Sequence, residues 1–320
     1  MNYIVEINNL SKDYEKGFLK KKRMRALDGL TLNVEPHQIF GFLGGNGAGK
    51  STTIKLLMRI VFPTEGSAKV LGVDISSTAM HAKIGYCPEN PYFYDYLKPL
   101  ELLDYFGSLQ GLNVTTRRAR AKELLQRVGL DEAAWNRQLR KFSKGMLQRV
   151  GIAQSLLGDP EIVFLDEPMS GLDPIGRRDI RELIAELRKN GKTVFMSSHI
   201  LSDIEALCDN VAILRKGKLV AQGNLEDLLT KTGETQKFEL YFTGIDEERL
   251  VATLRNFNVS NISAKANGAT AELADETKIS AAIDAVTNNG GRIVSVQPVK
   301  LALEEFFTET RPTEQESIEA

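Results

Sequence analysis

The chain has 320 residues, and its 41 Lys and Arg nearly balance 42 Asp and Glu, for a formal net charge of −1. The length allows a large core and two domains, whereas the balanced charge argues against binding driven by bulk charge, so no nucleic-acid partner is expected. The two cysteines, Cys87 and Cys208, belong to no motif, as is typical of a reducing compartment.

The N-terminal part of the chain predicts strands around a basic segment. Residues 3–8 and 30–35 alternate as strands do. Between them, KKKRMR at 20–25 is interpreted as a solvated loop, with contact to anionic lipid as the alternative. Residues 38–43 are a short apolar strand that leads into a glycine-rich turn and then a helix, which stops near Pro63.

The middle of the chain alternates helices and strands. Residues 98–126 are mostly helical, and EIVFLDEP at 161–168 is apolar, as in a strand buried on both faces. The elements expected after it are a helix at 175–190, a strand at 192–199, a helix at 200–207 and a hairpin at 211–223. This alternation predicts a parallel α/β sheet. No apolar run approaches the roughly 20 residues that span a bilayer, and the first residues are not typical of a signal peptide.

The pattern changes near residues 230–236. The order that follows is βαββαβ, which predicts a ferredoxin-like α+β domain. We therefore expect one domain over residues 1–230, with a helical subdomain at about 91–150, and a small domain over 231–310. Residues 311–320 form an acidic tail with little to bury, which predicts disorder.

The strongest local motif is GGNGAGKST at 44–52, which matches G-x-x-x-x-G-K-[ST]. Glycines let the backbone fold around an anion, and the N–H groups and the following helix N-terminus attract phosphate. Lys50 is expected to bind β- and γ-phosphates, and the Ser51 hydroxyl to ligate Mg²⁺. The candidate phosphate-binding residues are Gly44, Gly45, Asn46, Gly47, Ala48, Gly49, Lys50, Ser51 and Thr52.

Two carboxylates end the apolar strand IVFLDEP. Asp166 is expected to hold Mg²⁺, through water. Glu167 is the candidate general base toward a water that attacks the γ-phosphate. The alternative for the pair is a helix N-cap beside a surface acid.

In chain order the motifs are Tyr14, GGNGAGKST, YCPEN, FSKGM, IVFLDEP, SGLDP and SSHI. Their order and spacing resemble the ATP-binding subunits of ATP-binding cassette (ABC) transporters over roughly residues 3–230. They look most like the ABC-2 type, which pairs with separate permeases and is mostly an exporter. The resemblance implies a P-loop NTPase (ABC ATPase) core with an antiparallel β subdomain and a helical subdomain. It also implies hydrolysis of ATP with Mg²⁺.

The resemblance also assigns roles to single residues. Tyr14 aligns with an aromatic residue that stacks on adenine, although an ordinary strand-end tyrosine is the alternative. FSKGM aligns with the signature loop, usually LSGGQ: Ser143 and Gly145 match and the other three positions depart. In the family this loop caps the ATP held by the other subunit, and a helix N-terminus with a hydroxyl suits an anion. Simple N-capping by Ser143 is the alternative.

Three further residues complete the implied site. His199 aligns with the switch histidine, which contacts the γ-phosphate and positions water. Asp173 aligns with a loop that crosses the dimer interface, and it is also a candidate helix N-cap before Pro174. Glu89 stands where many relatives have a glutamine that contacts Mg²⁺ and the attacking water. A carboxylate can still ligate Mg²⁺.

The resemblance implies two partners. One is a second copy in a head-to-tail dimer, which supplies Ser143 and Gly145 to each site. The other is an ABC-2-type membrane permease, which would hold the cytoplasmic chain on the inner face of the cell membrane. The aromatic stretch 91–97 either packs in the helical subdomain or receives the permease. The alternatives are a soluble ABC ATPase acting on a non-membrane partner such as the ribosome, or a weakly hydrolysing ATP switch.

Overall fold

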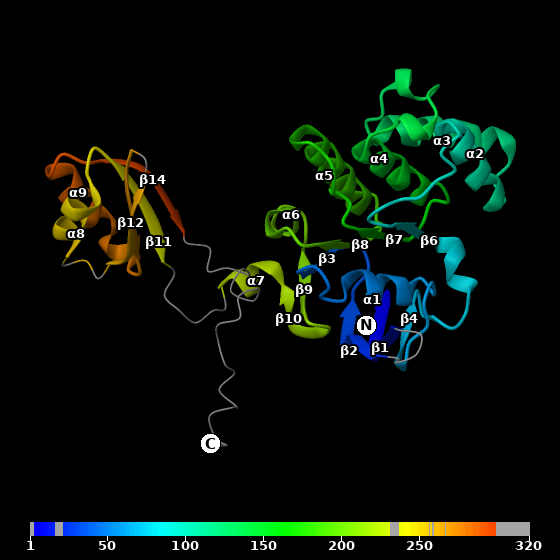
Figure 1. The fold of residues 1–320 in the computed structure, drawn as a ribbon, viewed down its shortest axis with the longest axis horizontal. Coiled ribbons are helices and arrows are strands. Elements are labelled where there is room, and N and C mark those ends of the chain that lie inside the picture. The colour runs from blue at the N-terminus through cyan, green and yellow to red at the C-terminus, as the bar shows by residue number, and fades with distance from the viewer. Residues whose placement is uncertain are drawn as a thin grey trace. The chain divides into compact units, whose positions relative to one another are not determined.

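The computed structural model of the chain describes residues 3–16, 22–230, 237–255, 257, 259–265 and 267–298 (Figure 1). The chain divides into two compact units, Met1–Leu225 and Glu226–Ala320. The acidic tail expected at 311–320 and the end of the expected small domain, residues 299–310, lie outside the described residues.

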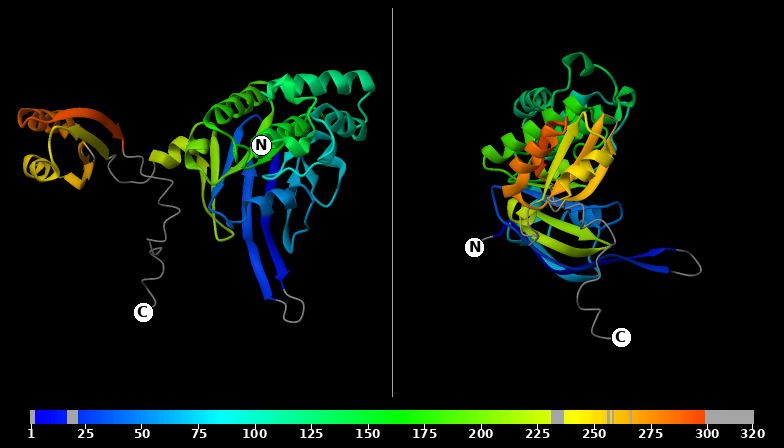
Figure 2. Two further views of the ribbon diagram at one scale, coloured as in Figure 1. Left: turned by 45° about the horizontal axis from the view of Figure 1, so that its top comes forward. Right: turned by 90° about the vertical axis from the view of Figure 1, so that its left-hand side faces the viewer.

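A four-stranded antiparallel sheet with the order β2-β1-β4-β5 contains both N-terminal strands. Its strands are β1 (Val5–Lys16), β2 (Lys22–Val34), β4 (Glu65–Val70) and β5 (Val73–Asp74). Figure 2 shows β1 and β2 as a long hairpin that projects from the rest of the first unit. The expected antiparallel β subdomain is therefore confirmed.

The interpretation of residues 20–25 as a loop is wrong for most of that segment. The pairing of β1 with β2 runs from Val5 opposite Val34 to Lys16 opposite Lys22. Ion pairs hold the outer part of this hairpin, because Arg23 and Arg25 both contact the Asp13 carboxylate, at 2.6 and 2.8 Å. Pairs of opposite charge on the two strands can thus extend the strand pairing beyond the residues where the apolar alternation stops.

The main sheet has six strands in the order β10-β9-β3-β8-β7-β6. All neighbours pair in parallel except β10, which forms the expected hairpin with β9. Its strands are β3 (Ile39–Gly44), β6 (Ile84–Cys87), β7 (Ile162–Asp166), β8 (Thr193–Ser198), β9 (Asn210–Arg215) and β10 (Lys218–Asn224).

The centre of this sheet lies deep in the first unit. Every residue of β3, β7 and β8 is buried, as expected for strands covered on both faces. The Phe195 ring lies 5.3–5.4 Å from the rings of Phe40, Phe42 and Phe164. This packing fixes the carboxyl ends of the three strands at one edge, where the predicted motifs stand.

Helices cover the main sheet, and α2, α3 and α4 gather as a helical subdomain (Figure 1). The α-helices of the first unit and the short helix that begins at its boundary are α1 (Lys50–Leu57), α2 (Pro99–Leu109), α3 (Val114–Arg127), α4 (Lys144–Ser155), α5 (Pro174–Lys189), α6 (Leu201–Glu205) and α7 (Leu225–Thr230). The 3₁₀ turns are η1 (Ala79–Lys83), η2 (Glu132–Ala134) and η3 (Leu139–Lys141).

Helix α1 is shorter than the sequence pattern predicts. It ends at Leu57, and Arg59 takes a left-handed backbone with φ of 55°. The N–H of Ile60 then donates to the carbonyl of Lys55 at 2.8 Å. Such a left-handed turn closes a helix by satisfying its last carbonyls, so the helix stops before Pro63 can interrupt it.

The second unit has the expected βαββαβ order. Its elements are β11 (Phe238–Thr243), α8 (Glu247–Leu254), β12 (Val259–Lys265), β13 (Gly268–Leu273), η4 (Glu276–Lys278), α9 (Ile279–Asn288) and β14 (Arg292–Pro298). The sheet order is β12-β13-β11-β14, with every pair antiparallel. This is the ferredoxin-like arrangement. Among the described helices, none combines the length and apolarity needed to cross a membrane.

Candidate nucleotide site

The phosphate loop joins β3 to α1 at the carboxyl edge of the main sheet. Gly49, the residue before the helix, has a φ of 108°, and a Cβ there would lie 2.7 Å from the Ala26 carbonyl oxygen. Only glycine fits this position. Gly49 has no side chain with which to cap the start of α1, so the first N–H groups of the helix are available to an anion.

Lys50 lies among oxygen atoms below this loop. Its Nζ donates to the carbonyls of Gly44 at 2.6 Å and Gly45 at 3.4 Å. The same ammonium lies 3.2 Å from Oε1 of Glu167, and both side chains are buried. A phosphate group would offer this buried cation a further charged partner.

Ser51 and Asp166 meet as the metal prediction requires. The Ser51 hydroxyl donates to Oδ1 of Asp166 at 3.1 Å. Ser197, which sequence reasoning missed, donates to the same oxygen at 2.6 Å and accepts the N–H of Glu167 at 3.0 Å. Hydroxyl and carboxylate oxygens at this spacing are the hard donors that Mg²⁺ prefers, so the residues fit this ion.

Glu167 and His199 form a close pair at the ends of β7 and β8. Nδ1 of His199 lies 2.8 Å from Oε2 of Glu167. Glu167 has a left-handed backbone with φ of 51°, which is unusual for a residue with a Cβ and typical of strained functional sites. This turn lets the side chain reach Lys50 with one oxygen and His199 with the other.

One cleft of about 470 Å³ unites most of the predicted residues. Gly44 and Asp166 do not line the cleft, but they accept hydrogen bonds from Lys50 and Ser51, which do. The residues that line the cleft are Tyr14, Met24, Ala26, Gly45, Asn46, Gly47, Ala48, Gly49, Lys50, Ser51, Thr52, Glu89, Glu167 and His199.

Tyr14 and Met24 lie opposite each other across β1 and β2 at one end of this cleft. Met24 is 57% exposed, and Lys12 places its ammonium 5.2 Å from the centre of the Tyr14 ring. Sequence reasoning missed Met24 because it lies in the segment interpreted as a loop. An aromatic ring beside a polarisable thioether is a suitable surface for a planar base.

Ser143, Gly145 and Asp173 do not line this cleft. Ser143 N-caps α4, since its hydroxyl accepts the N–H of Met146 at 3.3 Å. Asp173 N-caps α5 by accepting the N–H of Gly176 at 2.8 Å. Both side chains therefore make N-cap hydrogen bonds within their own chain. Gly145 is buried, and a Cβ there would lie 3.0 Å from the Gly171 carbonyl oxygen.

A smaller cavity of about 150 Å³ adjoins Glu167 and His199, and Asp203 and Arg177 also line it. Burial raises the pKa of the Asp203 carboxyl, and Arg177 opposes this shift. The closest atoms of the two side chains are 3.7 Å apart. Glu167 thus stands between the nucleotide cleft and a second polar space.

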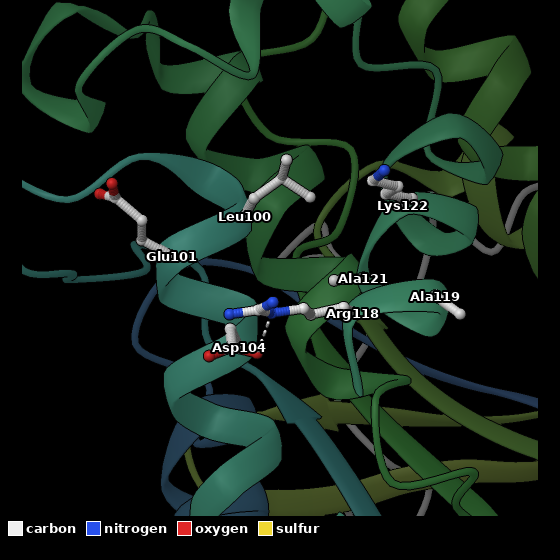
Figure 3. Close-up of a pocket in the computed structure, with 7 residues that line it drawn as sticks. All are labelled: Leu100, Glu101, Asp104, Arg118, Ala119, Ala121 and Lys122. Atoms are coloured by element: carbon white, nitrogen blue, oxygen red, sulfur yellow. Dashed lines mark ion pairs between the residues drawn. The ribbon is translucent and has the colours of Figure 1, made fainter. Parts of the chain in front are cut away.

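The helical subdomain carries two surface features. A groove of about 330 Å³ runs between α2 and α3, where Asp104 pairs with Arg118 at 3.7 Å (Figure 3). Exposed tyrosines lie between Glu89 and the end of α2, and we call them the tyrosine patch: Tyr92, Tyr94, Tyr96 and Tyr105.

Comparisons with known proteins point to one family. The ABC transporter family model matches residues 27–170. An uncharacterised ABC transporter ATP-binding protein of Synechocystis sp. is 40% identical over 305 residues, which cover 95% of this chain and 83% of the relative. The bacitracin transport ATP-binding protein BcrA of Enterococcus faecalis is 34% identical, over 75% of each chain.

A solved structure agrees. A dimeric ATP-binding cassette in a post-hydrolysis state, bound to ADP and Pi, superposes with a TM-score of 0.64 at 25% identity. The match covers 69% of this chain and 98% of that one. With a phosphate loop, paired carboxylates and a histidine around one cleft, the chain belongs to the ATP-binding proteins of ABC transporters, and it is an ATPase subunit.

Proposed function

We propose that two copies of this chain form a head-to-tail dimer that binds two ATP molecules and drives export through a separate ABC-2-type permease. The supporting observation is that the cleft contains Lys50, Glu167 and His199 but excludes the signature residues Ser143 and Gly145. A site of this family uses both sets, so a second copy supplies the missing set. The likeness to a bacitracin transport protein favours export.

Three residues that line the cleft act on the phosphates and the attacking water in this proposal. Lys50 binds the terminal phosphates, while Glu167 accepts a proton from the attacking water. His199 fixes the orientation of the Glu167 carboxylate through their 2.8 Å contact. Positioning of this kind supplies most of the catalysis in phosphoryl transfer.

Ser51, Asp166 and Glu89 would hold Mg²⁺. The ion, when bound, neutralises charge on the phosphates. Glu89 lines the cleft beside the phosphate loop, so its carboxylate can serve as an oxygen ligand where many relatives have an amide. The chain contributes these three oxygen donors.

ATP closes the proposed dimer because its γ-phosphate contacts both copies. Ser143 and the exposed start of α4 approach the phosphate from the partner side, because a helix N-terminus attracts an anion. Hydrolysis removes the shared contact, and the dimer opens. The permease converts this cycle into substrate movement.

We place the permease on the tyrosine patch, at the inner face of the cell membrane. Tyr92 is 97% exposed and Tyr96 is 59% exposed, and the ring centres of Tyr94 and Tyr96 are 6.1 Å apart. Such aromatic clusters are enriched at protein interfaces. The patch begins at Tyr92, shortly after Glu89 in the chain, so docking can influence the nucleotide cleft.

Glu167→Gln tests the dimer and the general base together. The variant should bind ATP, lose at least 100-fold in hydrolysis, as is typical when a catalytic base is removed, and elute as an ATP-dependent dimer in size-exclusion chromatography with light scattering. Ser143→Arg in the same background is the control and should stay monomeric with ATP. Turnover close to that of the wild type would contradict the role of Glu167.

Co-purification tests the permease. The wild-type chain should retain an ABC-2-type membrane protein from detergent-solubilised membranes. Tyr92→Ala combined with Tyr96→Ala should lose this partner and keep the ATPase activity of the isolated chain, because neither tyrosine lines the cleft. Retention of ribosomes alone would favour the soluble alternative.

A further inference from the structure

The lysine of the signature loop has a partner in its own chain. Lys144 stands where the usual loop has a small residue, and its Nζ donates to the Ser170 hydroxyl at 3.0 Å. Its aliphatic stem packs over Gly171, since a Cβ on that glycine would lie 2.9 Å from Cγ and Cδ of Lys144. We call these contacts the Lys144–Ser170 bridge.

Ser170, the second residue of the bridge, also contacts the candidate general base, Glu167. The N–H of Ser170 donates to the Glu167 carbonyl at 3.0 Å, which closes a turn over residues 167–170. Ser170 also lines the small cavity that Glu167 and His199 share. A displacement of Ser170 therefore acts on the backbone that orients the Glu167 carboxylate.

The two segments that the bridge joins are also packed against each other. Gly145 is buried so closely on Gly171 and Leu172 that a Cβ would meet both within 3.0–3.2 Å. Gly171 itself has a φ of 75°, which favours glycine. Close-packed backbones transmit displacement because there is little free volume to absorb it.

We propose that Lys144 is a positioning residue that couples the two ATP sites of the dimer. The inference rests on the proposed function, in which the signature loop of one copy serves the ATP of its partner while Glu167 serves its own ATP. When Ser143 engages the partner's phosphate, α4 shifts, and the Lys144–Ser170 bridge passes this shift to the copy's own Glu167. One site then responds to ATP in the other.

Cooperativity is the measurable consequence. ATP hydrolysis by the wild-type chain should show a Hill coefficient above 1 and at most 2, the number of coupled sites. Lys144→Ala and Ser170→Ala should each lower it by the same amount, toward 1, the value for independent sites. The double variant should match each single one, because residues that act through one contact are not additive.

The experiment has controls for folding and for other lysine roles. Lys144→Arg and Ser170→Thr keep a donor and a hydroxyl and should restore cooperativity at least in part. Lys141→Ala removes a neighbouring exposed lysine and should leave the Hill coefficient unchanged. The melting temperature should stay constant in Lys144→Ala, because Lys144 is exposed.

Three results would overturn the inference: a wild-type Hill coefficient of 1, additive effects in the double variant, or a loss of ATP affinity in Lys144→Ala that Ser170→Ala does not share. The last result would mean that Lys144 contacts the bound nucleotide directly and does not act through Ser170. ATP-dependent dimerisation of Glu167→Gln is measured first. If that variant stays monomeric, the proposed function fails; if it dimerises and one of the three results is found, only the inference fails.

Discussion

Two side chains that line the nucleotide cleft are brought together by the register of two paired strands. Tyr14 is opposite Met24 across β1 and β2, and both line the cleft. Among the described residues of this hairpin, Tyr14, Met24 and Ala26 line the cleft. We propose that the pair offers stacking and apolar contact to a nucleobase.

Met24→Ala should weaken ATP binding by roughly threefold to tenfold, equivalent to about 0.7–1.4 kcal/mol, because the base loses one apolar contact. Isothermal titration with ATP measures the change. Tripolyphosphate has no base and should bind both proteins equally. An equal loss for both ligands would contradict a contact between Met24 and the base.

The predictability of the site differs from residue to residue. The phosphate loop is contiguous, and Asp166, Glu167 and His199 end neighbouring parallel strands, so sequence alone brings them to one edge. The place of Met24 in the cleft depends on the register of the β1–β2 hairpin. That register could not be predicted, because the basic residues at 20–25 lack the apolar alternation of a strand. Likewise, Ser197 points to Asp166 only once the strands are paired.

Among the elements, the β1–β2 hairpin departs most from the sequence pattern. Apolar alternation predicts two short strands, whereas the ladder continues to Lys16 and Lys22. Ion pairs sustain its outer part: the Asp13 side chain is 5% exposed beneath Arg23 and Arg25. Hydrogen bonding from Arg25 lowers the pKa of Asp13 below its usual value of 3.8. Ion pairs between the two strands leave no periodic pattern in the sequence, so the outer part of the hairpin could not be predicted from it.

The lowered pKa of Asp13 predicts an acid-sensitive hairpin. A depressed carboxyl pKa stabilises the folded state above the ordinary value, near pH 4, and the effect is lost as pH falls through the lower folded value. Amide exchange in β1 and β2, corrected for intrinsic rates, should accelerate below pH 4 relative to β7. Asp13→Asn should exchange faster already at pH 7. If wild type and variant match at both pH values, the ion pairs do not hold the hairpin.

For the molecule as a whole, the sequence predicts the order of elements in both units well. Sequence patterns identify β3, β7, β8 and the β9–β10 hairpin of the main sheet but miss the short edge strand β6, and the βαββαβ order identifies the second unit. The separate core of the second unit, which includes Leu240, Phe242 and Leu250, follows from the same pattern. Helix ends and side-chain partners such as Lys144 and Ser170 are less predictable, because they depend on packing between distant segments.

The central claim is that each ATP is held between two copies of the chain. Mixing two defective proteins tests it directly, both in the Glu167→Gln background: one carries Lys50→Ala and the other Ser143→Arg. In a head-to-tail hybrid, one site combines an intact phosphate loop with an intact signature loop. Light scattering should detect an ATP-dependent dimer in the mixture and in neither protein alone. A mixture that stays monomeric with ATP, or either protein dimerising by itself, would contradict the claim.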